Sequence, residues 1–429
     1  MILSKPRILL YSHDTFGLGH LRRSLSIARQ IASDISGSHQ LLVTGSMVAG
    51  AFGLPPRLDM VKLPALSKRS SGKYKPRTLP LTLRQTIAWR EQMILQATIN
   101  FDPHLVLVDK VAAGVHGELL PTLRHLKTWS PNTKLVLGMR DIEDSPGTTR
   151  AEWAANGTIQ LQKDVYDRIL FYGQREVFDP VRAYGISDHI AAKLIPTGYL
   201  RRANTRRAPA SVRGELNIGD KPLVLVTVGG GGDGCEIIET YLDMLAAFPG
   251  EVPYHSLIVT GPLMAQKKRT LLRRSVLCTG QVTMLEFTPD LISYMAAADL
   301  VVGMAGYNTT CEILSLEKRA LLIPRVRVRV EQLIRAERLA ERGLVHMLHP
   351  AKLTPDRLKI AVETALAAPP PAVTLDMNGL ERISNAITAL LNRAEPVRTN
   401  RRNRPAKAAT MYEPMRMPRQ RNRAAAISI

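Results

Sequence analysis

Residues 223–247 read LVLVTVGGGGDGCEIIETYLDMLAA: a short apolar run, a cluster of glycines, and then apolar residues at helical spacing. The run at Leu223–Val228 predicts a buried strand, and Glu236–Ala247 predicts a helix. Five glycines fall within the six positions 229–234, where they let the backbone approach a bound group closely. A strand, a glycine turn and a helix make one βα unit, so this stretch favours a parallel α/β sheet.

The same alternation continues through both halves of the chain. The expected strands of the first half are 7–11, 41–44, 105–108, 135–137, 169–172 and 194–196, with helices that include 81–99 and 117–126. The expected strands of the second half are 223–228, 256–259, 282–287, 300–302 and 321–323, with helices at 236–247, 291–297, 309–316, 331–342, 353–367 and 380–391. Alternating strands and helices predict two Rossmann-like α/β domains, each built on a doubly wound parallel sheet.

The alternation pauses over 198–220, a basic stretch that is poor in apolar runs and so predicts a linker. We therefore expect a first domain at 1–200, a linker at 201–220 and a second domain at 221–392. From Arg393 onward, ten lysines and arginines face two acidic residues without apolar periodicity. This composition predicts a basic, disordered tail at 393–429.

The net positive charge of the chain indicates that its partners are anionic. The chain has 58 Lys and Arg against 37 Asp and Glu, a formal net charge of +21, which attracts polyanions. Aromatic residues are only 5%, and no helix-turn-helix, RRM or zinc-finger signature is present, so we expect no specific nucleic-acid binding. The three cysteines lie far apart, which excludes a zinc ribbon and a disulfide framework. Without a signal peptide or an apolar run of about 18 residues, the expected location is cytoplasmic.

The segment His13–His20 (HDTFGLGH) follows the first expected strand. Ligands of open α/β sheets sit at the carboxyl ends of the strands, so this glycine-containing loop is placed to meet one. His20 could take a proton from a substrate hydroxyl, or it could simply cap the following helix. Asp109 and Lys110 end the strand at 105–108 on the same edge, where a purely structural role is the alternative.

Two further segments have the residue types of a nucleotide site. Bare amides at 229–234, ahead of a helix, form an anion site suited to a diphosphate, or else a flexible turn. The segment 303–312 (GMAGYNTTCE) also opens a helix, where Glu312 could bond both ribose hydroxyls or complement the helix dipole.

The segment 324–329 (PRVRVR) precedes Glu331 and Gln332. Its three arginines alternate, so an extended backbone would place them on one side; a solvated basic edge is the alternative. No Asp-x-Asp pair is present to hold a divalent cation, so arginines and helix dipoles would have to stabilise a diphosphate.

In this order, the segments resemble those of family 28 glycosyltransferases with the GT-B fold, the family of MurG-type GlcNAc transferases and plant galactolipid synthases. The matching segments are a Gly-His loop (17–20), a Thr-Gly segment ending in arginine (197–201), a Gly-Gly-Ser-x-Gly loop (230–234), a Ser-Arg-Ala-Gly…Glu helix (303–312), and a proline followed by Gln-Gln (324, 331–332). The chain departs from the family at three of them: Gly232 stands in place of serine, Gly303-Met304 in place of Ser-Arg, and Glu331 in place of glutamine.

The resemblance implies transfer of a sugar from a nucleotide-diphosphate sugar, a UDP-sugar, to a hydroxyl acceptor that is lipid-linked or related to envelope polysaccharide. It implies direct displacement with inversion and without metal or another cofactor. His20 would be the base. The donor nucleotide would contact Arg201, Gly230, Gly231, Gly232, Gly234, Phe287, Gly306, Thr309 and Glu312. The donor sugar would contact Glu331 and Gln332. The acceptor side would include His13, Gly17, Gly19, Asp109 and Lys110.

The basic excess then predicts peripheral binding at the inner face of the cytoplasmic membrane, through the tail and a cluster at Lys62, Lys68, Arg69, Lys73, Lys75, Arg77 and Arg84. Both could instead be solvated, and the tail could bind nucleic acid non-specifically. Two alternatives to transfer remain: a sugar-nucleotide hydrolase or epimerase, and a non-catalytic binding protein on a GT-B scaffold.

Overall fold

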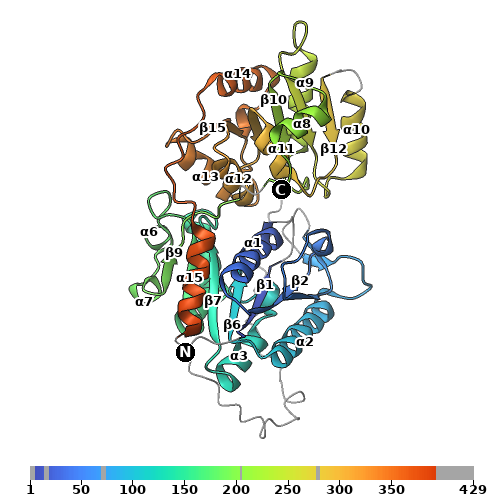
Figure 1. Ribbon diagram of the computed structural model, residues 1–429. Helices are drawn as coiled ribbons and strands as arrows, with labels where there is room; N and C mark the ends of the chain where they lie inside the picture. Colours follow the sequence, from blue (N-terminus) through green and yellow to red (C-terminus); the bar gives the residue numbers. More distant parts are fainter. Residues whose placement is uncertain (1–4, 14–18, 69–73, 203–204, 277–280, 393–429) are drawn as a thin grey trace, which may run out of the picture. The chain divides into compact units, whose positions relative to one another are not determined.

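The computed structural model describes residues 5–13, 19–68, 74–202, 205–276 and 281–392 (Figure 1). A seven-stranded parallel sheet in the first half has the order β3-β2-β1-β6-β7-β8-β9. Its strands are β1 (Arg7–Ser12), β2 (His39–Thr44), β3 (Leu58–Lys62), β6 (Leu105–Asp109), β7 (Lys134–Arg140), β8 (Arg168–Tyr172) and β9 (Leu194–Pro196). The two expected Rossmann-like halves are confirmed.

A six-stranded parallel sheet in the second half has the order β12-β11-β10-β13-β14-β15. Its strands are β10 (Leu223–Thr227), β11 (His255–Val259), β12 (Val282–Leu285), β13 (Leu300–Gly303), β14 (Ala320–Leu322) and β15 (His346–Met347). In each sheet the strand order reverses beside the first strand, between β1 and β6 and between β10 and β13. Ligands bind at such switch points, and the candidate segments 13–20, 109–110, 229–234 and 303–312 all follow these four strands.

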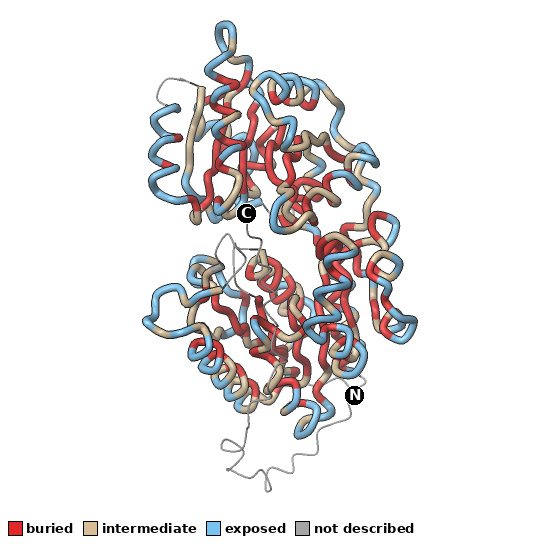
Figure 2. The backbone as a smooth tube through the Cα atoms, turned by 180° about the vertical axis from the view of Figure 1, so that it is seen from behind, coloured by how far each residue is buried: buried red, intermediate tan, exposed pale blue. Residues whose placement is uncertain are grey.

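Helices cover both faces of each sheet, which is why the central strands contain contiguous buried apolar runs, such as residues 105–108 and 223–226, rather than one apolar face (Figure 2). The helices of the first half are α1 (Gly19–Asp34), α2 (Leu83–Phe101), α3 (Leu120–Trp129), α4 (Pro146–Ala155), α5 (Thr158–Asp164), α6 (Pro180–Tyr184) and α7 (Asp188–Ala191). Those that follow are α8 (Pro209–Leu216), α9 (Cys235–Ala246), α10 (Gln266–Val276), α11 (Leu291–Ala297), α12 (Tyr307–Ser315), α13 (Glu331–Ala340), α14 (Pro355–Ala367) and α15 (Gly379–Asn392). A hairpin of β4 (Leu66–Lys68) and β5 (Tyr74–Pro76), with short 3-10 turns at Ala49–Ala51, Val115–Gly117 and Pro350–Lys352, completes the described elements.

The core alternates along the strands as the pleat requires. Ile8 and Leu10 of β1 pack with α1 and α15, while Leu9 and Tyr11 pack on the opposite face with α2 and α3. In the second half, Val224 and Val226 pack with α9 and α14.

Two segments differ from the sequence-based expectation. Residues 201–220 are not a featureless linker, because α8 lies within them and packs against α11 through the fully buried Val212. The last helix, α15, was expected to close the second domain, but it packs against α1 of the first sheet (Figure 1). Backbone bonds Tyr199 N to Asp376 O (2.8 Å) and Gly379 N to Tyr199 O (3.0 Å) fix this return of the chain. The expected tail, 393–429, lies outside the described residues.

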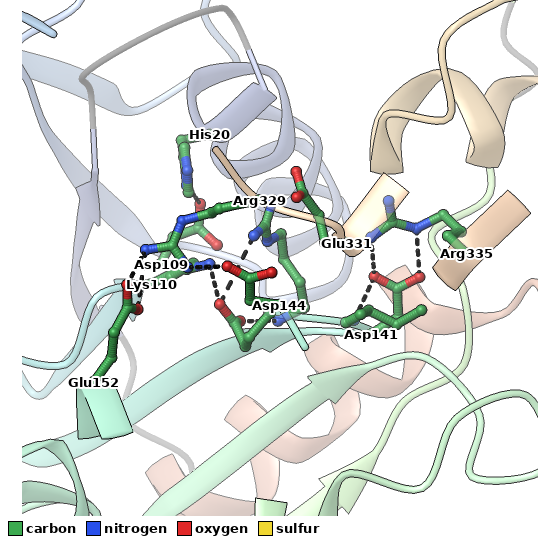
Figure 3. A network of polar contacts seen from close by, with 12 residues as sticks. His20, Asp109, Lys110, Asp141, Asp144, Glu152, Arg329, Glu331 and Arg335 are labelled. Atoms are coloured by element: carbon green, nitrogen blue, oxygen red, sulfur yellow. Dashed lines mark hydrogen bonds and ion pairs between the residues drawn. The ribbon is translucent and has the colours of Figure 1, made fainter. Parts of the chain in front are cut away.

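One buried ion pair joins the two halves. Arg335 of α13 donates to both carboxylate oxygens of Asp141, which follows β7, at 2.6 and 2.7 Å (Figure 3). Its third bond, at 2.8 Å, goes to the carbonyl oxygen of Ala305. Both side chains are 1% exposed, so each charge depends on the other for its solvation.

We predict that Asp141→Ala lowers the free energy of unfolding by about 3–5 kcal/mol, because it leaves a buried guanidinium without a counter-charge. The matched control is Arg338→Ala on the same helix, which breaks the exposed Arg338–Glu341 pair and should cost less than about 1 kcal/mol. Urea unfolding measures both changes, and equal losses in the two variants would contradict the role given to the buried pair.

Candidate functional site

A hollow at the two switch points contains most of the expected donor residues. The expected residues that line it are Gly19, His20, Gly230, Gly232, Phe287, Gly306, Thr309, Glu331 and Gln332. Four arginines line it as well: Arg22, Arg23, Arg140 and Arg325. Neither Arg22 nor Arg23 was expected from the sequence, although they stand two and three positions after His20.

The glycine loop after β10 is tightly constrained. Gly231 has φ +82°, and a Cβ there would lie 2.2 Å from the carbonyl oxygen of Thr260. Gly234 has φ +87° and begins α9 as a cap without a side-chain hydrogen bond. Gly306 begins α12 in the same uncapped way. The first residues of α12 line this hollow, and the glycine loop ahead of α9 lines it through Gly229, Gly230 and Gly232. Uncapped helix N-termini of this kind favour an anion.

His20 lies at the start of α1 and contacts two charged groups. Its Nδ1 is 3.0 Å from Asp109 Oδ2 and 3.0 Å from Arg23 Nη2. Arg23 also donates to both Asp109 oxygens at 2.8 Å, and these two side chains are 2% exposed. Burial lowers the pKa of His20 to about 4; the hydrogen bond to Asp109 opposes this shift and the Arg23 cation adds to it. The imidazole is therefore neutral at pH 7.

The other acceptor-side candidates do not all reach the hollow. His13 is buried and its ring meets that of His20 edge-on, with centroids 5.3 Å apart. Lys110 pairs with Glu143 and lines a separate small hollow that also includes Trp153 and Arg329. Burial and the Arg140 cation lower the pKa of Lys110 to about 8, against the opposing effect of Glu143. Gly17 lies outside the described residues.

Glu312 is buried beneath two arginines rather than lining the hollow. Its Oε1 accepts from Arg22 Nη2 at 2.5 Å and from Arg202 Nη1 at 3.3 Å. Its Oε2 has no hydrogen-bond partner among the described residues, although the side chain is only 1% exposed. A contact of Glu312 with ribose therefore stays a prediction, and such a contact would use the unpartnered oxygen.

The arginine expected at the diphosphate needs a correction. Arg201 is exposed and lines a different surface hollow with Gln30, Asp34 and Glu381. The next residue, Arg202, contacts α12 and α1 instead: it donates to Glu312, to the carbonyl oxygen of Arg22 at 2.8 Å and to Ser26 Oγ at 2.9 Å. The Thr-Gly segment thus places its second arginine, not its first, beside α12.

The arginines after Pro324 do not share one side, because this segment forms no strand. Arg325 Nη1 donates to Asp233 at 2.9 Å, and its Nη2 donates to Glu331 at 2.7 Å. Arg329 donates to Glu152 at 2.8 and 2.9 Å and to Asp144 at 3.4 Å, which ties this segment to the first half (Figure 3). Arg327 is exposed, so the alternative of a solvated edge holds only for this arginine.

The comparisons with known proteins agree with this architecture. Residues 223–388 match the family described as the glycosyltransferase family 28 C-terminal domain. One relative is the UDP-N-acetylglucosamine–N-acetylmuramyl-(pentapeptide) pyrophosphoryl-undecaprenol N-acetylglucosamine transferase of Alkaliphilus metalliredigens, 28% identical over 184 residues. The match covers 41% of this chain and 48% of that relative, so the chain spans about half the length of the curated relatives it matches.

Solved structures extend the likeness to the whole fold. MurG of Acinetobacter baumannii superposes with a TM-score of 0.52 at 14% identity, covering 90% of this chain and 99% of that one. The UDP-GlcNAc 2-epimerase of Methanocaldococcus jannaschii gives 0.56 at 12% identity, covering 90% and 99%. The GT-B fold and the resemblance to family 28 are therefore confirmed, and the family match lies in the second half of the chain. None of the described helices is both long and apolar enough to cross a membrane.

We predict that Arg202→Ala lowers the free energy of unfolding by about 2–3 kcal/mol, because it removes a charged donor from the buried Glu312. Its exposed neighbour supplies the control: Arg201→Ala should change stability by less than about 0.5 kcal/mol. Chemical denaturation of the two variants tests this, and a larger loss for Arg201→Ala would return the site role to that residue.

Proposed function

We propose that this protein is a glycosyltransferase that moves a sugar from a UDP-sugar to a hydroxyl acceptor, by direct displacement with inversion and without a metal ion. The observation that carries the proposal is the composition of the hollow. A glycine loop, the uncapped N-terminus of α12 and a neutral histidine line it together, and its four arginines outnumber its two carboxylates, Asp233 and Glu331. These groups suit a diphosphate leaving group beside a base.

His20 is the proposed base. We assign the tautomer in which Nδ1–H donates to the Asp109 carboxylate, which leaves the Nε2 lone pair for the acceptor hydroxyl. Arg23 Nη2, also 3.0 Å from Nδ1, then directs its hydrogen to Asp109 Oδ2 instead. The hydroxyl oxygen forms the new bond to the anomeric carbon as its proton passes to Nε2. The bond from that carbon to the β-phosphate oxygen breaks on the opposite face, and UDP leaves with the electron pair.

The charge that develops on UDP has compensation in the chain itself. Gly230 and Gly232 bring the backbone to the hollow, and the dipoles of α9 and α12 favour negative charge at their N-termini. Arg22, Arg140 and Arg325 add fixed positive charges around the same space. These groups support stabilisation of the leaving group without a metal ion. Phe287, which is 37% exposed and lines the hollow, supplies an aromatic edge for the uracil ring of UDP.

For the acceptor we propose a lipid-linked or envelope-polysaccharide hydroxyl presented at the inner face of the cytoplasmic membrane. The relative named above acts, by its name, on a pyrophosphoryl-undecaprenol substrate. Within the basic cluster, Lys62, Lys75, Arg77 and Arg84 are exposed, and the nearby Leu79 is 40% exposed. Exposed cations with an apolar residue among them suit an anionic bilayer surface.

The donor site is tested by calorimetric titration with UDP, GDP, ADP and dTDP, each with and without magnesium. We expect UDP to bind independently of magnesium, and Glu312→Gln to weaken its binding by about tenfold. Failure of the wild-type protein to bind any of the four would refute the transferase and favour a non-catalytic scaffold. Release of free sugar, or of an epimer, from UDP-sugars without an acceptor would favour the hydrolase or epimerase.

The base is tested by transfer of labelled sugar from UDP-sugars to a membrane lipid extract. His20→Ala should bind UDP like the wild-type protein but transfer about 100- to 10,000-fold more slowly. Unchanged transfer would remove the base role from this residue.

The protonation state of His20 gives a separate prediction. Its pKa is about 4 in the folded chain but about 6.5 unfolded, so the unfolded state binds more protons between these values. Stability therefore rises with pH across this window, and His20→Asn should flatten the rise. In nitrogen-15 NMR, His20 should be neutral with a protonated Nδ1 at pH 7; an imidazolium signal at pH 7 would contradict the assignment.

A further inference from the structure

Arg325 holds together two acidic residues that come from different segments of the hollow. Asp233 belongs to the glycine loop ahead of α9, and Glu331 is the first residue of α13. One guanidinium nitrogen reaches Asp233 Oδ2 at 2.9 Å and another reaches Glu331 Oε1 at 2.7 Å. The backbone N–H of Arg325 also donates to Gln332 Oε1 at 3.2 Å. Three segments that line the donor site therefore meet at one side chain.

The two carboxylates are unfavourable for the ligand that the site is built to hold. Asp233 places a negative charge next to the glycines of an anion site, where it repels a diphosphate. Glu331, 4% exposed, places another where a glutamine would be neutral. Arg325 lies between them and offsets both. Its own pKa is raised by Glu331 and Asp233 despite the lowering effect of burial, so the guanidinium keeps its charge there.

We propose that Arg325 is a positioning residue for the donor: it bridges Asp233 and Glu331, offsets part of their negative charge, and so fixes the diphosphate loop relative to the donor-sugar residues. This inference rests on the proposed function. Glu331 Oε2 and Arg325 Nε are buried without a hydrogen-bond partner among the described residues, so each retains one bonding position for the donor. The glutamate that replaces glutamine at 331 and the aspartate at 233 are then coupled through Arg325 rather than independent of each other.

The test is a double-mutant cycle in which each substitution removes a charge and UDP affinity is measured by calorimetry. The variants are Arg325→Gln, Asp233→Asn and the double variant, with Arg327→Gln as the matched control. Arg325→Gln should weaken UDP binding by about tenfold or more, because Asp233 then faces the diphosphate uncompensated. Asp233→Asn should bind UDP as tightly as the wild-type protein or more tightly. The double variant should recover most of the loss, and Arg327→Gln should stay within about twofold.

The salt dependence of UDP binding distinguishes repulsion between Asp233 and the diphosphate from misfolding of the variant. Because dissolved ions screen exposed charges, the defect of Arg325→Gln should shrink as sodium chloride rises, which a disordered loop would not do. Should Arg325→Gln fail to fold, Asp233→Asn alone decides, since a tenfold weaker UDP affinity there would overturn the proposed repulsion. Wild-type affinity in Arg325→Gln, or a double variant no better than Arg325→Gln, would also overturn it.

The outcomes distinguish this inference from the function on which it rests. A wild-type protein that binds none of the four nucleoside diphosphates refutes both. A wild-type protein that binds UDP, with Arg325→Gln unaffected, refutes the positioning role of Arg325 and leaves the transferase in place.

Discussion

A buried arginine needs a carboxylate partner, because its charge has lost its solvation by water. Such pairs fix the positions of residues near the ends of the strands. Arg23 with Asp109, Arg90 with Glu118 and Arg335 with Asp141 each form two hydrogen bonds between side chains that are at most 2% exposed. Each pair joins elements distant in sequence, because an unpaired charge in either partner would be strongly unfavourable. Geometry at the strand ends is therefore set by charge pairing as much as by apolar packing.

The same constraint prepares the proposed base. Since Arg23 satisfies both oxygens of Asp109, the carboxylate is held in place and its pKa lies far below the ordinary range, through Arg23 and His20 acting against burial. A fixed carboxylate orients the imidazole, while desolvation keeps that imidazole unprotonated. A histidine that is neutral near pH 7 has the lone pair that a base needs, though a pKa of about 4 makes it a weak one until a bound diphosphate adds negative charge nearby.

The sequence predicts those elements that a local pattern of residues determines. Contiguous apolar runs located the central strands, and glycines between a strand and a helix located the anion loop. Elements without such a pattern were missed: β15 has two residues, α10 (QKKRTLLRRSV) is mostly basic, and α8 lies in a stretch that looks like a linker. Arg22 was missed for a different reason. Arg22 and Glu312 are 290 positions apart in the sequence, and no local spacing of residues can indicate a partner so far along the chain.

Departures from a family motif acquire meaning only when their contacts are known. Taken singly, an aspartate in the glycine loop and a glutamate in place of glutamine each suggest a weakened nucleotide site. Arg325 contacts both, so its single positive charge offsets part of their negative charge; Arg140, which pairs with Glu143, lines the same hollow. The pairing of Arg325 with Asp233 and Glu331 would serve no purpose beside the hollow in a protein that no longer binds a diphosphate. The coupled set therefore favours a retained diphosphate site over an idle scaffold.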